Sequence, residues 1–221
     1  MNVTLIAATP FPEQLCGAAA AVCTNSDDHE RSLKHALASG HTSVLEHAVF
    51  TFIVDGLSRA ALTQLTRHRV ASFDVQSQRY VRLENPELVI PESIKASPFA
   101  AEVESTMRYV MNLYQRMVEA GIPCEDARYV TPQAVPTTLI MTMNARELLH
   151  FFSLRTCNRA QWEIRELADR MLCICKEKAP LLFEIAGPAC VTGFCMEKRP
   201  CGHPRAEDDW NNKKSDTEES K

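Results

Sequence analysis

The sequence contains few glycines, and they do not cluster. The seven glycines stand apart at positions 17, 40, 56, 121, 187, 193 and 202 of the 221 residues. A loop that cradles a dinucleotide or a phosphate with its backbone needs clustered glycines, so the sequence excludes such a loop. Side chains must bind any phosphate instead. The 16 arginines outnumber the 8 lysines, which suits that role because a guanidinium group binds phosphate through two parallel N–H groups.

The sequence also lacks a basic excess and a long apolar run. Its formal net charge is −4 at pH 7, which disfavours a protein that coats duplex nucleic acid. No apolar run is long enough to span a bilayer, and residues 1–25 lack the positive start of a secretory signal. Nine cysteines without such a signal are typical of a reducing compartment. We expect a cytoplasmic protein with no nucleic-acid partner and no membrane contact.

No strong metal motif is present. His41 and His47 flank Glu46 but stand six residues apart, so one helical face cannot present both, and the HExxH pattern is absent. The other interpretation of this segment is a capped turn that begins at Thr42 or Ser43. We expect no metal site.

Hydrophobic periodicity predicts an α+β fold, with a mixed, largely antiparallel sheet flanked by helices. Strands are expected at 2–8, 47–55 and 137–143, and helices at 12–23, 28–38, 58–67, 99–118, 145–156 and 160–178. The polar segment that ends at Ser77 is too short for another element, and Gln78–Leu83 is expected to be extended.

Composition divides the chain into three parts. Residues 1–186 form one main domain, residues 187–205 are a cysteine-rich extension, and residues 206–221 are polar enough to be a flexible, disordered tail.

Polar side chains are densest in Thr66–Tyr80, which reads TRHRVASFDVQSQRY. Arg67 and Arg69 stand two positions apart and on a helix face different directions, so they would meet different partners. Gln64 precedes Arg67 by three positions and shares its helical face. The segment is therefore either a site for two anionic ligands or a solvated basic surface.

A second polar set lies in the helical run Asn144–Arg165. Asn144 and Arg155 are eleven residues apart, close to three turns, and can point into one pocket. Arg155 follows two phenylalanines and a leucine, so it needs an anionic or polar partner if it is buried. Arg159 with Glu163, and Glu166 with Arg170, are expected to be solvent ion pairs.

The RHR motif followed by a serine, Arg67 to Ser77, resembles the signature of the flavin-dependent thymidylate synthases. The segments GHTSVLEHAVFTF, SQRY and NAR…LR…AQWEIR resemble further segments of that family in the expected order, from about residue 2 to 186. The resemblance implies a homotetramer with active sites shared between subunits. It also implies FAD as cofactor, with dUMP, methylenetetrahydrofolate and NADPH as substrates.

The resemblance further implies roles for individual residues. The dUMP contacts would be Gln64, Leu65, Thr66, Arg67, Val75, Gln76, Ser77, Gln78, Arg79, Arg128 and Arg155, the last two from a neighbouring chain. The FAD contacts would be Ser43, Arg67, His68, Arg69, Val75, Asn144, Ala145, Arg146 and His150. Val75 stands where the family often has Glu, and His150 stands where a flavin-facing Asn is expected.

The implied reaction converts dUMP to dTMP. Arg155 would be catalytic, because it would favour the deprotonated imide of the uracil ring and make the carbon to be methylated nucleophilic. Ser77 would only position the nucleotide, because no base and carboxylate pair is identifiable around it.

Two other functions remain open on the residues alone. A single-stranded nucleic-acid binding module could use the same arginines with Phe73 and Tyr80 as stacking platforms. A zinc-binding interaction protein could be built on Cys190, Cys195, Cys201 and His203, although no CxxC pair is present.

Overall fold

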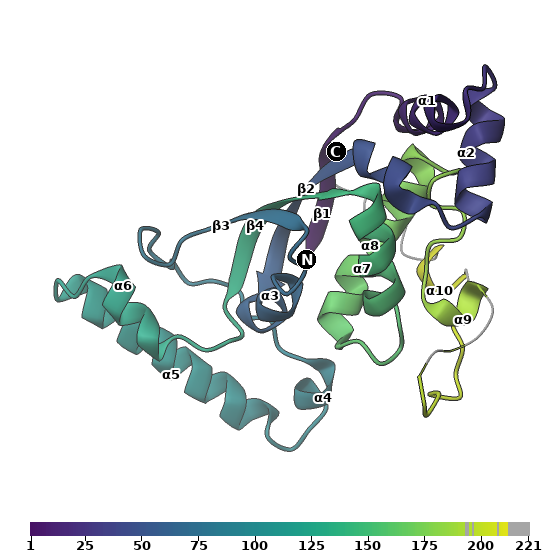
Figure 1. Cartoon of the computed structure of the whole chain (residues 1–221). Helices are drawn as coiled ribbons and strands as arrows, with labels where there is room; N and C mark the ends of the chain where they lie inside the picture. The colour runs from purple at the N-terminus through teal and green to yellow at the C-terminus, as the bar shows by residue number, and fades with distance from the viewer. Residues whose placement is uncertain (193–194, 196, 207, 212–221) are drawn as a thin grey trace.

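The computed structural model describes residues 1–192, 195, 197–206 and 208–211 and has the expected α+β architecture (Figure 1). Its four strands are β1 (Asn2–Ala8), β2 (Val49–Ser58), β3 (Ala71–Val75) and β4 (Pro136–Asn144). They form one sheet in the order β1-β2-β4-β3. Each neighbouring pair of these strands is antiparallel, so the described sheet is not mixed.

The two central strands carry the apolar face of the sheet. Phe50, Phe52 and Val54 alternate along β2 and are fully buried. Phe50 pairs with Met143 and Phe52 with Met141, so these side chains share one face. A period of two places them all toward the core, as the sequence pattern predicts.

Strand β3 corrects the sequence prediction, which left its residues without an element and made Gln78–Leu83 extended. Ala71, Phe73 and Val75 are half-buried while the residues between them are exposed, and Ala71 pairs with Met143. The strand forms because β4 offers a free edge, which local sequence does not show. Residues 78–80 form a turn instead.

Six helical segments surround the sheet near their predicted positions. They are α1 (Pro12–Thr24), α2 (His29–Ala38), the 3₁₀ helix η1 (Thr42–His47), α3 (Arg59–Leu65), α7 (Ala145–Arg155) and α8 (Trp162–Lys178). The buried side chains of α7 and α8, including Phe151, Phe152 and Leu167, belong to the same core cluster as those of β2 and β4. The turn expected from Thr42 or Ser43 is present as η1, which begins at Thr42, but no side chain caps it.

Glu163 at the start of α8 is buried, rather than paired with Arg159 in solvent. Its two carboxylate oxygens accept hydrogen bonds from the Ser58 backbone N–H and hydroxyl, both at 2.5 Å. The Ser58 hydroxyl in turn accepts from the Ala61 N–H at 3.1 Å and caps α3. This contact fixes where α3 begins. The predicted Glu166–Arg170 pair is present at 2.9 Å, but it is partly buried rather than open to solvent.

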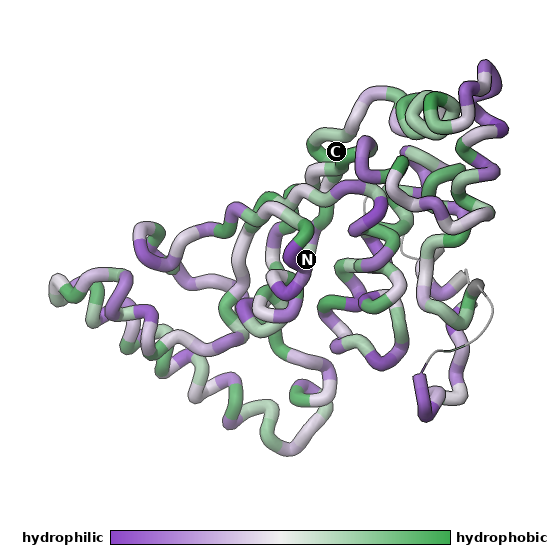
Figure 2. Tube along the Cα trace, in the orientation of Figure 1, coloured by the Kyte–Doolittle hydropathy of each residue, from purple (hydrophilic) through white to green (hydrophobic). Residues whose placement is uncertain are grey.

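A separate arm projects from the sheet (Figure 1). It contains α4 (Glu92–Lys95), α5 (Ala100–Glu119), α6 (Cys124–Ala127) and η2 (Arg128–Val130). A small second core holds it together, formed by Leu83, Met111, Tyr114, Ala127 and Val135. Hydrophobic positions recur among hydrophilic ones along α5 in Figure 2, as in an amphipathic helix with one apolar face.

The chain after residue 186 packs back on the main domain through α9 (Ala189–Thr192) and α10 (Asp208–Asn211). Trp210 is fully buried in the main core, so residues 208–211, at the start of the predicted polar tail, contact the main domain. The burial of the Trp210 indole is enough to hold this segment against the core, although the residues around it are polar. Residues 212–221 lie outside the described part of the chain. No helix among the described residues is long and apolar enough to cross a membrane.

Candidate active site

A buried histidine lies where the RHR turn meets α7. His68 follows α3 and is 5% exposed. Its Nδ1 lies 2.9 Å from Oε1 of Glu147, and its Nε2 accepts a hydrogen bond from Nε of Arg155 at 3.1 Å. Glu147, Phe151 and Arg155 stand four residues apart on one face of α7, and the Phe151 ring meets His68 edge to face. One helical face therefore holds the imidazole on three sides.

These contacts fix the protonation of His68. A guanidinium group can only donate, so Nε2 must carry the lone pair and Nδ1 the proton, which it donates to Glu147. Burial lowers the pKa of His68, the Glu147 carboxylate raises it, and the cation of Arg155 lowers it again. The net shift is downward, so the imidazole is neutral near pH 7.

Two arginines gather beside this histidine. Arg155 donates from Nη2 to the Gln64 carbonyl at 3.3 Å, and both burial and the charge of Arg67 lower its pKa. No carboxylate pairs with Arg67 among the described residues. We call Gln64, Arg67, His68, Glu147 and Arg155 the histidine cluster. Its unpaired positive charge can bind an anion.

A second cationic group lies at the other end of β3. Arg79 pairs with Glu125 through Nε at 2.5 Å, and Arg128 donates from Nε to the Glu125 carbonyl at 3.0 Å. The hydroxyl of Ser77 accepts from the Arg79 N–H at 3.1 Å. We call Ser77, Arg79, Glu125 and Arg128 the serine-end cluster. Strand β3 advances about 3.4 Å per residue, so about 14 Å of strand separates the two clusters.

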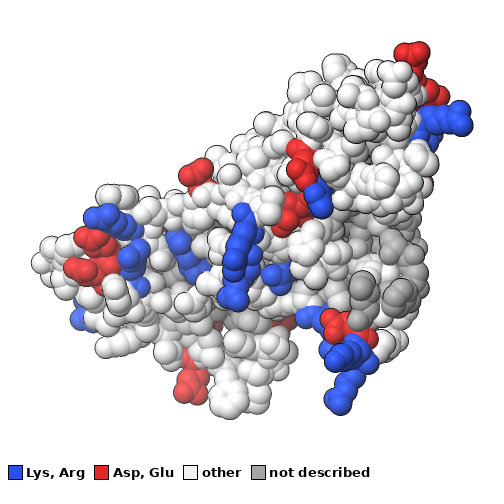
Figure 3. Space-filling view, viewed as in Figure 1, with Lys and Arg blue, Asp and Glu red and all other residues white. Residues whose placement is uncertain are grey.

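Within one chain the predicted site residues fall into two groups. Arg155, expected to reach dUMP from a neighbouring chain, contacts the Gln64 carbonyl of its own chain. Arg128 lies with Ser77 and Arg79. Figure 3 shows Lys and Arg side chains along the middle of the viewed face, over α3 and the strands beside it.

The predicted flavin contacts gather around the start of α7. Asn144 caps this helix, because its Oδ1 accepts from the Glu147 N–H at 2.9 Å. Arg146 forms an ion pair with Glu46 of η1, the element that carries Ser43. His150 is exposed, and its ring lies 5.9 Å from that of His68. The structure therefore brings most of these residues to one region, beside the histidine cluster.

Several predicted contacts can act only through their backbones. The side chains of Leu65 and Ala145 are fully buried in the core, which limits any ligand contact to main-chain atoms.

Asn144 and Arg155, expected to share a pocket, are at opposite ends of α7. Thr66 ends α3, so Arg67 lies in a turn rather than on the helix with Gln64. Gln76 donates its N–H to Thr138, and Gln78 is in the turn that follows.

Sequence reasoning missed two functional candidates. Glu147 orients His68, and a signal existed, because it stands four residues before Phe151 on the buried face of α7. Arg59 donates from Nη2 to the Gln76 carbonyl at 2.7 Å beside the serine-end cluster. Its Nε is buried without a partner in the described structure, and burial and the charge of Arg128 lower its pKa. No sequence signal marks Arg59.

Among the described residues, His68, Glu147 and His150 form the one group with ligand atoms close enough to hold a metal ion. Arg155 already occupies Nε2 of His68, and Nδ1 faces Glu147. The alternative zinc set, Cys190, Cys195, Cys201 and His203, does not come together as such a group in the described part of the chain.

The neutral state of His68 predicts a pH dependence. Its folded-state pKa is below the unfolded value of about 6.5, so the unfolded chain binds the proton more readily. The stability from neutral His68 is thus complete above pH 6.5 and declines as the pH falls toward the folded-state pKa. We expect Tm to fall more steeply from pH 7 to 5 in the wild-type protein than in His68→Gln, measured by calorimetry. Parallel curves would contradict a neutral buried His68.

Known proteins with similar sequences are thymidylate synthases or proteins of that family. Residues 4–181 match the family model described as thymidylate synthase complementing protein. A flavin-dependent thymidylate synthase of Geobacter sulfurreducens is 46% identical over 212 residues, covering 89% of this chain and 91% of its own. One of Pyrococcus furiosus is 46% identical over 187 residues, covering 79% and 75%, and one of Clostridium tetani is 38% identical over 226 residues, covering 89% and 91%.

The family match spans both cationic clusters, as well as α3 and α7. The RHR turn, the serine after β3 and the Asn-Ala-Arg start of α7 all lie inside the matched residues. On the family match and these relatives, the chain belongs to the flavin-dependent thymidylate synthase family.

Proposed function

We propose that this chain makes dTMP by reductive methylation of dUMP, with FAD as the flavin, methylenetetrahydrofolate as carbon donor and NADPH as reductant. The observation that carries this assignment is the histidine cluster. It places two arginines without carboxylate partners beside a neutral imidazole, at the start of the RHR motif.

The residues present fit a flavin. Among the residues that the structure describes, the side chains of Arg67 and Arg69 have no ion pair or hydrogen bond. They are therefore available for the diphosphate, which the scattered glycines cannot hold. The first turn of α7 is the positive end of an 11-residue helix and adds a favourable potential for an anion. Bound flavin supplies the hydride that completes the methyl group.

Arg155 is the residue that we assign to the chemical step. Two contacts hold its guanidinium, one to His68 and one to the Gln64 carbonyl, and its Nη1 has no partner among the described residues. Donors fixed before the reaction and aimed at developing negative charge are a large catalytic contribution. We assign this group to the uracil imide, where it favours the deprotonated ring.

The two clusters support a site built from two chains. Residues assigned to one dUMP lie in both clusters, at opposite ends of β3, a strand about 14 Å long, so a single chain does not gather them around one point. A site that combines the histidine cluster of one subunit with the serine-end cluster of another resolves this. We therefore propose a homotetramer with shared sites.

The flavin spectrum tests this function directly. We expect the purified protein to be yellow, with oxidised-flavin absorption bands that bleach when NADPH and dUMP are added without oxygen. With methylenetetrahydrofolate added, dTMP should appear by chromatography. A colourless protein that gains no such bands after incubation with FAD would refute the proposal.

A further inference from the structure

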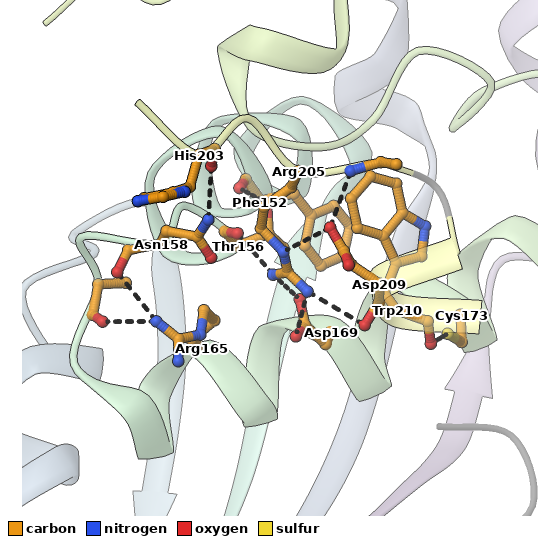
Figure 4. A network of polar contacts seen from close by, with 12 residues as sticks. Phe152, Thr156, Asn158, Arg165, Asp169, Cys173, His203, Arg205, Asp209 and Trp210 are labelled. Carbon is orange, nitrogen blue, oxygen red and sulfur yellow. Dashed lines mark hydrogen bonds and ion pairs between the residues drawn. The ribbon is translucent and has the colours of Figure 1, made fainter. Parts of the chain in front are cut away.

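The C-terminal extension contacts the loop that follows Arg155. This loop, residues 156–161, joins α7 to α8. Asn158 donates from Nδ2 to the His203 carbonyl at 2.7 Å, and Arg159 donates to the Arg199 carbonyl. Figure 4 shows the segment that carries His203 and Arg205 lying over the loop and the end of α7. The extension and the loop are therefore bound to each other at several points.

Arg205 makes the deepest of these contacts. Its side chain is 6% exposed, and its two terminal nitrogens bind the two carboxylate oxygens of Asp169 at 2.8 and 3.1 Å. The nitrogen Nη1 also donates to the Thr156 carbonyl at 2.7 Å. A guanidinium is a rigid plane, so a carboxylate that binds both nitrogens also fixes where the third hydrogen bond points. Trp210, which is fully buried, packs over the same guanidinium at 5.4 Å.

The bonded carbonyl belongs to the residue directly after Arg155. Thr156 ends α7, and the last carbonyls of a helix have no partner within the helix. Arg205 supplies one partner, and its positive charge suits the negative end of the helix. On the other side, Arg165 donates to the carbonyls of Asn158 and Ala160 at 3.0 and 3.3 Å. The turn that presents Arg155 is thus held on both sides by arginines.

We propose that Arg205 is a positioning residue for Arg155, acting through Thr156. The family model matches residues 4–181, so Arg205 lies outside the matched domain. Positioning matters because a shift of about 1 Å in a catalytic group can cost a hundredfold in rate. The inference depends on the proposed role of Arg155 in the chemical step.

The decisive variant replaces the whole buried ion pair. Arg205→Met with Asp169→Leu removes both charges and keeps apolar volume, an exchange that is often neutral or stabilising. It also removes the hydrogen bonds that Arg205 donates to the carbonyls of Thr156 and Asp209 and its contact with the half-exposed Asp209 carboxylate at 3.7 Å. We expect an unchanged or higher Tm and unchanged flavin content. The value of kcat/KM for dUMP should fall by about tenfold or more, because the last turn of α7 loses its anchor.

Two further variants separate positioning from stability. Glu166→Gln breaks the other arginine–carboxylate pair of α8 and should leave kcat/KM for dUMP within about twofold of wild type. Arg205→Lys keeps the charge but loses the planar two-nitrogen contact with Asp169 that fixes the direction of the Thr156 bond, so it should lower kcat/KM for dUMP without losing flavin. This variant also carries the test if the double variant does not fold.

The outcomes distinguish this inference from the proposed function. A double variant with wild-type Tm and wild-type dUMP kinetics would show that Arg205 is only structural, whatever Arg155 does. If Arg155→Ala turns over dUMP normally, Arg155 has no role in the chemical step, and the positioning role of Arg205 falls with it. A fall in kcat/KM for dUMP in both Arg155→Ala and the double variant, with flavin retained, supports both.

Discussion

Arg155→Ala is expected to lower dTMP turnover by about a hundredfold or more, which is the scale of losing a fixed electrostatic donor. Arg155 is the arginine that contacts both His68 and Gln64. The charge of Arg67 lies close to it, so the two guanidinium groups together favour binding of an anion. Arg155→Lys keeps the charge but loses the planar fork, so it should recover only part of the activity. Reduction of bound flavin by NADPH should survive both changes, because that half-reaction does not involve uracil.

Stopped-flow absorbance measures the reduction step, and chromatography measures dTMP. Ser77→Ala serves as the contrast, because its hydroxyl binds the Arg79 backbone in a turn. It should weaken dUMP binding and leave measurable turnover at saturating dUMP. If Ser77→Ala abolishes turnover while Arg155→Ala does not, the roles are reversed and a nucleophilic serine must be reconsidered.

A mixture of two crippled variants is expected to regain activity. Arg155→Ala damages the histidine cluster and Arg79→Ala damages the serine-end cluster, and these clusters lie at opposite ends of β3. If one site takes one cluster from each of two chains, an equal mixture contains intact sites at about one in four. Activity after subunit exchange should therefore approach about a quarter of wild type.

The matched control mixes Arg67→Ala with Arg155→Ala. Both residues belong to the histidine cluster of a single chain, so every site in the mixture carries at least one defect and activity should stay low. Recovery in this control but not in the first mixture would mean that the pocket is divided differently. No recovery in either, with exchange verified by mass spectrometry, would indicate a site within one chain.

Much of the site was predictable because its residues lie in strong local patterns. The RHR turn follows from its motif and β1 has the predicted bounds, whereas helical phase placed Asn144 and Arg155 in one pocket although they lie at opposite ends of α7. Strand β3 could not be predicted, because its pairing depends on the edge of a strand 60 residues later in the chain. The grouping of the arginines depends on the same pairing. Sequence places Arg128 and Arg155 near dUMP without showing which cluster each one joins.

Buried charge was the other feature that the sequence did not show. Glu163 looked like half of a solvent pair because Arg159 stands four residues before it, but the hydroxyl and N–H of Ser58 are its partners. Asp169 and Arg205 are 36 residues apart and form a buried pair. Both cases depend on long-range contacts, whereas helical spacing reports only neighbours on one helix.

Trp210 gives the docking of the extension an optical signature. Its indole is fully buried, with the guanidinium of Arg205 and the ammonium of Lys176 at 5.4 and 5.6 Å from the ring centroid. The chain has two tryptophans, and the other, Trp162, is 37% exposed. Emission from the two indoles therefore separates by wavelength and by access to iodide. A Trp162→Phe protein carries Trp210 as its single tryptophan, and indole emission excited at the red edge, where the four tyrosines do not absorb, reports whether the C-terminal segment is seated.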